Sequence, residues 1–292
     1  MLKELRKKLS CRNALPIVGG LLIVGLFAFI IFKIFGPPSG RPVKIIDINT
    51  ADSIVIHSDS LVKPVLYVKV PDFSKLSVKD RKKKFVHLML PAILLAQEKI
   101  AVERLQIERL LKKTKEQGFS SEDSIVLNNF LEKFNAKNES DLLNRLHPHP
   151  ASIVLAQAAI ESGWGSSRFF KEANNAFGIW SYNSDEQRIV AGESRGENTI
   201  FLRSYDTLFD SVYDYLLVIA RGSAYKDFRK SRMKSQNPYR LIWFLSNYSE
   251  KRLGYVVSLR NVIEFNDLSQ YDHYQLEEID ENDENWEKLL AL

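Results

Sequence analysis

The first clear feature of the hydrophobic pattern is an unbroken apolar run near the N-terminus. No residue from Ala14 to Phe32 is charged, and at ~1.5 Å per residue this run is about long enough to cross a hydrocarbon core ~30 Å thick. The segment 1–13 ahead of it is basic, which predicts a cytoplasmic N-terminus. We therefore predict a single-pass transmembrane helix over 14–35 in the cell (inner) membrane, with the following residues in the periplasm or outside the cell.

The alternative for this run is a cleaved signal peptide. Such a peptide has an apolar region of only ~7–15 residues and a small-residue cleavage site. The run here is longer, and the sequence KIFGPPSG that follows it has no A-x-A-like site. The pattern therefore favours an uncleaved anchor.

Beyond the anchor, the periodicity is mostly helical. The proline- and glycine-rich stretch 36–42 begins a linker or stem over 36–63, where β-branched runs fit short strands or an extended stem. Apolar residues at helical spacing then continue from Ser77 to a stop at Gly118, with a kink or break expected at Pro91. Later helices are predicted in SEDSIVLNNFLEKF, DTLFDSVYDYLLVIARG, NPYRLIWFLSNYS and KRLGYVVSLRNVIEF, and a β-hairpin or flap in QRIVAGESRGENTIFLRSY (187–205). The fold class is therefore mainly α, with one main domain over 64–270.

Composition and charge exclude several classes of protein. With 45% hydrophobic and 26% charged residues, the chain is not disordered throughout. The formal charge of +5 is uneven, because the acidic tail 271–292 leaves a basic body suited to a polyanion. No helix-turn-helix, zinc-finger or RNP-like spacing points to nucleic acid. The single cysteine, Cys11, excludes an intramolecular disulfide and a cysteine metal cluster.

The candidate chemistry lies in AQAAIESGWG (156–165). Pro150 suits the first turn of a helix and Gly163 its end, so Glu161 falls in the last turn. The helix dipole and apolar neighbours both disfavour an ionised carboxylate there and raise its pKa. An acid that keeps its proton near neutral pH is what a glycosidase needs to protonate a leaving oxygen. The competing interpretation is a solvated glutamate at a helix end.

The segments that follow Glu161 supply polar and aromatic groups. SGWGSSRF adds small residues and a turn, and NNAFGIW (174–180) adds two amides and two aromatic rings, which suit a sugar carrying an acetamido group. The candidate substrate-binding residues are Trp164, Asn174, Asn175, Phe177, Trp180 and Tyr205. A core position is the competing interpretation for Phe177 and for Trp180, and packing of the flap is that for Tyr205.

At this point the sequence resembles a known family. LAQAAIESGWGSSRFFKEANNAFGIW is similar to the signature of the Bax-type glucosaminidases of glycoside hydrolase family 73. The similarity extends over about residues 64–268, through PDFSKLSVKDRKKKFVHLMLPAILLAQEKI upstream and LSNYSEKRLGYVVSLRNVIEFNDL downstream. The resemblance implies a lysozyme-like helical fold, cleavage of peptidoglycan after N-acetylglucosamine, and Glu161 as the catalytic acid. It implies no cofactor.

The resemblance places a second carboxylate in the flap, where Glu197 ranks ahead of Glu193 and Asp185 and Glu186 lie just before them. The substrate's own acetamido group could replace a protein carboxylate. Other outcomes stay open: a muramidase or lytic transglycosylase on the same polymer, or a non-catalytic wall-binding protein. HPHP (147–150) is not expected to bind a metal, because its proline extends the backbone and no third ligand is nearby.

Overall fold

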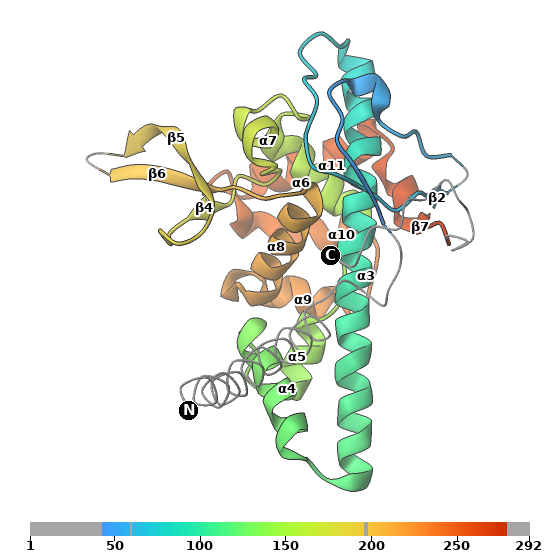
Figure 1. The fold of residues 1–292 in the computed structure, drawn as a ribbon, viewed down its shortest axis with the longest axis vertical. Helices are drawn as coiled ribbons and strands as arrows, with labels where there is room; N and C mark the ends of the chain where they lie inside the picture. The colour runs from blue at the N-terminus through green and yellow to red at the C-terminus, as the bar shows by residue number, and fades with distance from the viewer. Residues whose placement is uncertain (1–42, 59, 196–197, 279–292) are drawn as a thin grey trace, which may run out of the picture. The chain divides into compact units, whose positions relative to one another are not determined.

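The computed structural model describes residues 43–58, 60–195 and 198–278. The expected transmembrane helix 14–35 and residues 279–292 of the acidic tail lie outside the described residues. The described part is mainly α, with three small sheets and one projecting hairpin (Figure 1). The mainly helical fold with a small β-hairpin is thus confirmed.

The longest element is α3 (Val78–Gln117), of 40 residues, which at ~1.5 Å per residue extends over about 60 Å. It begins where the Ser77 side chain accepts a hydrogen bond from the backbone of Asp80, and it ends at Gly118, whose φ of +79° suits glycine. The first half is almost wholly apolar and buried, from Phe85 to Ala96. This half forms the centre of the core.

The expected break at Pro91 is not present, because α3 runs through it. A proline inside a helix leaves the carbonyl four residues earlier without its usual donor. That carbonyl belongs to His87, and the Nε2 of His57 lies 3.3 Å from it. The backbone N–H of His57 also donates to Nδ1 of His87, at 3.3 Å. Residues outside the helix therefore supply the hydrogen bond that Pro91 removes.

The second half of α3 packs against α4 (Ser121–Lys133) and α5 (Glu139–Arg145). A capping box between Ser120 and Asp123 starts α4, as the serine and acids in the sequence predicted. On α3, Glu103 is buried and accepts from Lys133 Nζ at 2.9 Å and from the Tyr213 hydroxyl at 2.8 Å. These contacts satisfy the one acid on the buried side of this half.

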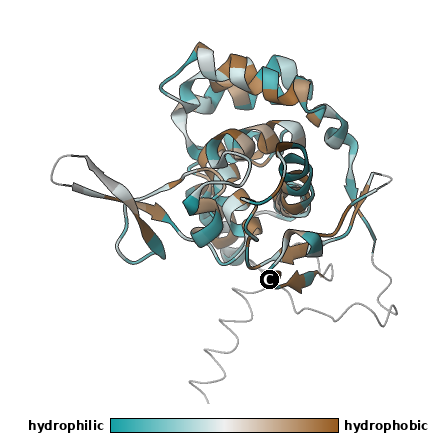
Figure 2. Ribbon diagram, turned by 90° about the horizontal axis from the view of Figure 1, so that it is seen from above, coloured by the Kyte–Doolittle hydropathy of each residue, from teal (hydrophilic) through white to brown (hydrophobic). Residues whose placement is uncertain are grey.

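The helix α6 (Ala151–Ser162) is surrounded by other helices and contacts α3 and α11 (Leu253–Phe265). This explains its largely apolar sequence, since every residue from Ala151 to Ala159 is buried. Hydrophobic and hydrophilic residues alternate around the outer helices (Figure 2). The other helical elements are α7 (Arg168–Ala173), α8 (Leu208–Arg221), η3 (Ser223–Tyr225), α9 (Lys226–Arg232), α10 (Pro238–Leu241), η4 (Ile242–Tyr248) and η5 (Leu268–His273).

The predicted hairpin is confirmed and projects from the helices (Figure 1). Its strands β5 (Arg188–Arg195) and β6 (Asn198–Arg203) are antiparallel, and β4 (Trp180–Ser181) pairs with the other edge of β6. The register shifts between Val190 and Ser194, where Gly192 has a φ of +85°. Glycine is suited to such a bulge.

The segment expected as a linker packs onto the domain from residue 43 onward. Strand β1 (Lys44–Ile46) pairs in parallel with β3 (Val65–Tyr67), and β2 (Leu61–Val62) pairs with β7 (Gln275–Leu276). The side chains of Ile48 and Ile54 are buried. The compact body therefore includes residues on both sides of the range 64–270.

One helix of the described residues is long and apolar enough to span a membrane by composition, and this is α3. However, 72% of its most apolar window is buried inside the protein. The packing of α3 is that of a core helix.

Candidate active site

Glu161 lies in the last turn of α6, as the sequence predicted. The helix ends because Gly163 adopts the left-handed conformation, with φ +57° and ψ +45°. The Ser162 hydroxyl donates to the Ala158 carbonyl at 2.6 Å and accepts from the Gly165 N–H at 3.0 Å. This turn fixes the backbone on both sides of the acid.

The two residues that follow Gly163 also have positive φ. Trp164 has a φ of +57°, which is uncommon for a residue with a side chain, and its ring packs edge-on against Phe85 with centroids 5.6 Å apart. Gly165 has a φ of +78°, and a Cβ there would lie 2.9 Å from the Phe73 ring. The sequence GWG is thus required by the tight turn beneath Glu161, and Trp164 is half-buried in it.

The Glu161 carboxyl is open to solvent but closely surrounded by protein. The residue is exposed, and its Oε1 accepts a hydrogen bond of 2.9 Å from the Tyr255 hydroxyl. Burial of the carboxyl raises its pKa, while the Tyr255 hydrogen bond and the Lys251 charge act in the opposite direction. The net shift is upward, which favours a carboxylic acid that holds its proton.

A chain of buried hydrogen bonds continues from Tyr255 into the core. The Gln157 side chain donates to the Tyr255 oxygen at 3.1 Å, and the Tyr215 hydroxyl donates to Gln157 Oε1 at 2.5 Å. His149 Nε2 lies 3.0 Å from the Tyr215 oxygen, and an Arg232 nitrogen lies 3.4 Å from His149 Nδ1. We call these five residues the hydrogen-bond chain.

The direction of the chain follows from the donors. Arg232 can only donate, so His149 Nδ1 is the acceptor and Nε2 carries the proton. Burial lowers the pKa of His149 well below its usual value, so the ring is neutral. Because the Tyr215 proton points to Gln157, His149 donates to Tyr215. Every donor in the chain therefore points toward Glu161.

Three tyrosines that were not predicted as site residues surround this end of α6. Tyr248 stacks on Tyr255 with centroids 5.5 Å apart, and Tyr225 lies 6.2 Å from the Tyr248 ring. No local pattern links them to Glu161, because they come from η3, η4 and α11. Gln157 could have been predicted as a site residue, because it is a polar residue one turn before Glu161 in a mostly apolar helix.

The two amides of NNAFGIW are bound to the backbone. Asn174 donates to the carbonyls of Val68, Tyr205 and Asp206, at 3.2, 2.9 and 3.1 Å. Asn175 is 1% exposed and bonds both the N–H and the carbonyl of Ile179. Both side chains hold the base of the hairpin against the body, rather than facing solvent as groups for a sugar.

The aromatic residues of this motif divide into one core residue and one exposed residue. Phe177 is buried and stacks on Tyr215 with centroids 4.1 Å apart, so it supports the hydrogen-bond chain from below. Trp180 on β4 is 38% exposed and lies 6.2 Å from the ring of the highly exposed Tyr182. Of the two, Trp180 is the one placed to contact a ligand.

Tyr205 lies at the base of the hairpin, in an ionic cluster. Its hydroxyl donates to Asp214 Oδ2 at 2.7 Å, and Arg203 bridges Asp214 at 2.7 Å and Glu186 at 3.1 Å. Burial alone would raise the pKa of Glu186, but its contacts with Ser181 and Arg203 together hold that pKa below the usual value. Glu186 is therefore an ionised, paired carboxylate.

The two flap acids predicted as the second carboxylate have no described side-chain contacts. Glu193 belongs to β5 by its backbone, and Glu197 lies outside the described residues. Their assignment as the second carboxylate stays a prediction.

The described side chains include no group of three or more His, Cys, Asp or Glu that could hold a metal ion. Of the histidines in HPHP, His149 belongs to the hydrogen-bond chain, and His147 Nε2 lies 3.1 Å from Gln236 Nε2.

Comparison with known proteins identifies the region that carries this geometry. Residues 138–268 match the family model described as mannosyl-glycoprotein endo-beta-N-acetylglucosaminidase. We call the matched residues the glucosaminidase domain. It begins at the N-cap of α5 and ends at the start of η5, so it contains Glu161, the hydrogen-bond chain and the hairpin. The helices α3 and α4 precede it.

Two curated relatives match different shares of the chain. Protein bax of Escherichia coli is 27% identical over 201 residues, which cover 64% of this chain and 70% of that protein. The exo-glucosaminidase LytG of Bacillus subtilis is 26% identical over 147 residues, 45% of this chain. The match spans 49% of LytG, about half of its length.

Solved structures with some similarity include the catalytic domain of the autolysin Auto from Listeria monocytogenes, at 21% identity, 57% of this chain, 87% of that chain and a TM-score of 0.36. A peptidoglycan hydrolase from Sphingomonas sp. A1 has 20% identity, with 49% of this chain and 91% of that chain covered and a TM-score of 0.35.

Proposed function

We propose that the glucosaminidase domain is a peptidoglycan hydrolase that cleaves the glycan strand after N-acetylglucosamine, in the endo manner, with Glu161 as the general acid. The observation that carries the proposal is the Glu161 carboxyl: it is open to solvent, its pKa is raised, and the hydrogen-bond chain ends on it at the neutral Tyr255 hydroxyl. The family match over 138–268 supports the same conclusion.

The chemistry follows from these contacts. Protonated Glu161 gives its proton to the glycosidic oxygen as the bond to the anomeric carbon breaks. The carboxylate that results keeps the hydrogen bond from Tyr255, whose own pKa is raised by burial and by Glu161, so the tyrosine retains its proton. Tyr255 thus stabilises the negative charge that appears during the reaction.

The second half of the reaction needs a nucleophile on the anomeric carbon. We propose a water molecule activated by a hairpin carboxylate, Glu197 or Glu193, or internal attack by the substrate's acetamido group. Trp180 is the candidate for direct contact with the sugar. The other selected residues support this site from the turn, the hairpin base and the core: Trp164, Asn174, Asn175, Phe177 and Tyr205.

The test is the substitution Glu161→Gln in the full chain. General acid catalysis contributes about 10²–10⁴-fold, so we expect release of soluble fragments from purified sacculi to fall by at least about 100-fold. Glu172→Gln is the matched control, because Glu172 is an exposed glutamate on the next helix, α7, where it pairs with Arg168 at the surface. A Glu161→Gln enzyme that digests sacculi at the wild-type rate contradicts the proposal.

Product analysis separates the linkages. Mass spectrometry after borohydride reduction should find N-acetylglucosamine at the new reducing ends. A 1,6-anhydro-muramic end would instead identify a lytic transglycosylase, and reducing muramic acid a muramidase. Sacculus binding without loss of turbidity would identify a non-catalytic wall-binding protein. Fragments of many lengths at early times indicate endo cleavage, whereas single disaccharides indicate the exo cleavage named for LytG.

The location of this activity is part of the proposal. The uncharged run over 14–32 and the basic residues before it support an anchor in the cell membrane with the domain on the outer side. Cys11 is the single cysteine, so it should resist a membrane-impermeant maleimide in spheroplasts. A cysteine placed at Ser184, in an exposed turn before β5, should react. The reverse labelling would overturn the orientation.

A further inference from the structure

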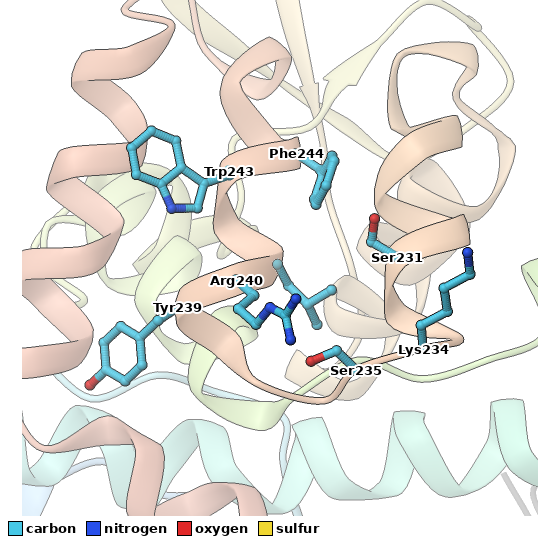
Figure 3. Close-up of a pocket in the computed structure, with 8 residues that line it drawn as sticks. Ser231, Lys234, Ser235, Tyr239, Arg240, Trp243 and Phe244 are labelled. Atoms are coloured by element: carbon cyan, nitrogen blue, oxygen red, sulfur yellow. The ribbon is translucent and has the colours of Figure 1, made fainter.

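A hollow lined by none of the Glu161 contacts lies between α9 and the segment α10–η4 (Figure 3). Its volume is about 410 Å³. Ser231 on α9 and Phe244 on η4 point toward one another across it, and the Arg240 side chain lies below Phe244 (Figure 3). The residues that line this hollow, which we call the α9–η4 cavity, are Ser231, Lys234, Ser235, Tyr239, Arg240, Leu241, Trp243 and Phe244.

The cavity presents positive charge. Lys234 and Arg240 are exposed, and neither forms an ion pair with any carboxylate of the described residues. The surrounding stretch 221–252 contains nine Lys or Arg and only two Asp or Glu. Several of these cations bind backbone carbonyls inside the protein, as Arg229 and Arg232 do. The two at the cavity remain available to an anion from outside.

The cavity also presents exposed aromatic rings. Trp243 is 55% exposed and Phe244 is 39% exposed, although both lie on an element whose Ile242 and Leu245 are buried. Large exposed rings beside unpaired cations and serine hydroxyls are typical of a surface that binds a ligand with both apolar and anionic groups. A packed core needs none of these three features.

The same short helix links the cavity to Glu161. Phe244 lines the cavity, and Tyr248, four residues later on η4, stacks on Tyr255 at a centroid distance of 5.5 Å. A 3₁₀ helix rises ~2.0 Å per residue, so these two positions of η4 are about 8 Å apart along it. The cavity and the aromatic stack beside Glu161 are therefore carried by one element, η4.

We infer that the α9–η4 cavity binds the peptide stems of peptidoglycan. A stem is attached to the lactyl group of each muramic acid and carries free carboxylates, which match Lys234 and Arg240. Its alkyl side chains match Phe244 and Trp243, and its amides match the hydroxyls of Ser231 and Ser235. The inference rests on the proposed function, because it takes the glycan strand as the polymer at Glu161.

The experiment compares two double variants of the full chain. Lys234→Ala/Arg240→Ala removes the unpaired charge from the cavity. Lys226→Ala/Lys230→Ala is the matched control, because both of its lysines are exposed on α9 and neither lines the cavity. Each protein acts on sacculi and on glycan strands from which an amidase has removed the peptides, and thermal unfolding checks that each is folded.

The cavity variant should have a KM on peptide-bearing substrate raised by about tenfold, as expected for the loss of two exposed charge pairs. Its kcat should be unchanged, and its KM on peptide-free strands should stay within about twofold of wild type. The kcat and KM of the control variant should also stay within about twofold of wild type. Trp243→Ala should raise the same KM, whereas Phe265→Ala, at an aromatic residue 80% exposed on α11, should not.

Equal loss on both substrates, or no loss on either, would overturn the inference. So would a cavity variant whose only defect is weaker binding to anionic vesicles, since that result assigns the cavity to lipid headgroups. A direct measurement uses the Glu161→Gln protein with a disaccharide-tetrapeptide as the probe. If wild type hydrolyses nothing but this probe binds and depends on Lys234 and Arg240, the proposed function fails and the inference stands.

Discussion

Two glutamates of this domain, Glu161 and Glu186, experience opposite environments. Glu161 faces a neutral hydroxyl at 2.9 Å, and burial raises its pKa. Glu186 faces the Arg203 guanidinium at 3.1 Å, and its pKa is held low. A carboxyl beside neutral donors is ready to give a proton, whereas one beside a guanidinium is ready only to hold a structure. Burial decides the direction of the pKa shift at Glu161, whereas the contacts with Ser181 and Arg203 decide it at Glu186.

The largest structural effect is expected at the base of the hairpin. Arg203→Met leaves Glu186 and Asp214 without the cation that they share, and we expect a loss of about 2 kcal/mol and a Tm lower by about 4–8 °C. Arg260→Met, in an exposed pair with Glu264, should change stability by less than about 1 kcal/mol. Calorimetry at neutral pH measures both.

The pH dependence of this loss has a definite sign. The pKa of Glu186 is lowered in the folded protein, so its contribution is present above its usual pKa of 4.5 and is lost as the pH falls through the folded value. The Tm difference between wild type and Arg203→Met should therefore shrink below about pH 5. A difference that grows toward acid pH would contradict the ionic account.

The next effect concerns catalysis at the other glutamate. Tyr255→Phe removes the donor that stabilises ionised Glu161, so kcat should fall by about 10–100-fold. The same loss raises the pKa of Glu161 further, and the alkaline limb of the rate profile should move to higher pH. Tyr274→Phe is the control, since no described hydroxyl bond of Tyr274 reaches the site. An unshifted alkaline limb would reduce Tyr255 to a packing residue.

A weaker version of this effect is expected one step along the chain. Gln157→Met interrupts the chain between Tyr215 and Tyr255, and the loss of about 1 kcal/mol of hydrogen bonding corresponds to roughly a fivefold lower kcat. The alkaline limb should move in the same direction as for Tyr255→Phe, by less. Gln97→Met removes a comparable amide bond, to the His149 carbonyl at 2.7 Å, and should change stability without moving the pH profile.

How far the sequence predicts this molecule depends on how local each cause is. Ser120 and Gly163 mark helix ends by contacts within a few residues, and so the limits of α4 and α6 were predictable. The continuity of α3 at Pro91 was not, because the compensating His57 lies 30 residues before His87. Local sequence patterns predict caps and turns, whereas a tertiary contact can compensate for the hydrogen bond that a proline removes from a helix.

The same distinction holds at the site. Glu161 was predictable from its own helix, but its partner Tyr255 is 94 residues away. The amides of Asn174 and Asn175 suit a sugar by chemistry alone, and only the structure shows that backbone carbonyls occupy them. Sequence chemistry gives the capacity of a side chain, and the fold decides which partner uses it.

The smallest predicted effect sharpens the comparison of the two glutamates by its sign. A carboxyl whose pKa is raised by folding costs stability above its usual pKa of 4.5, so Glu161→Gln should have a higher Tm than wild type at pH 7. Because Glu161 is exposed, the gain should be small, and it should vanish as the pH approaches 4.5. Glu186→Gln should lower the Tm at pH 7, because it removes an ionised partner of Arg203. Thermal unfolding of both variants from pH 4 to pH 8 measures this. If both glutamines shifted the Tm in the same direction, the two carboxyls would not differ in the way that makes one an acid and the other a structural anion.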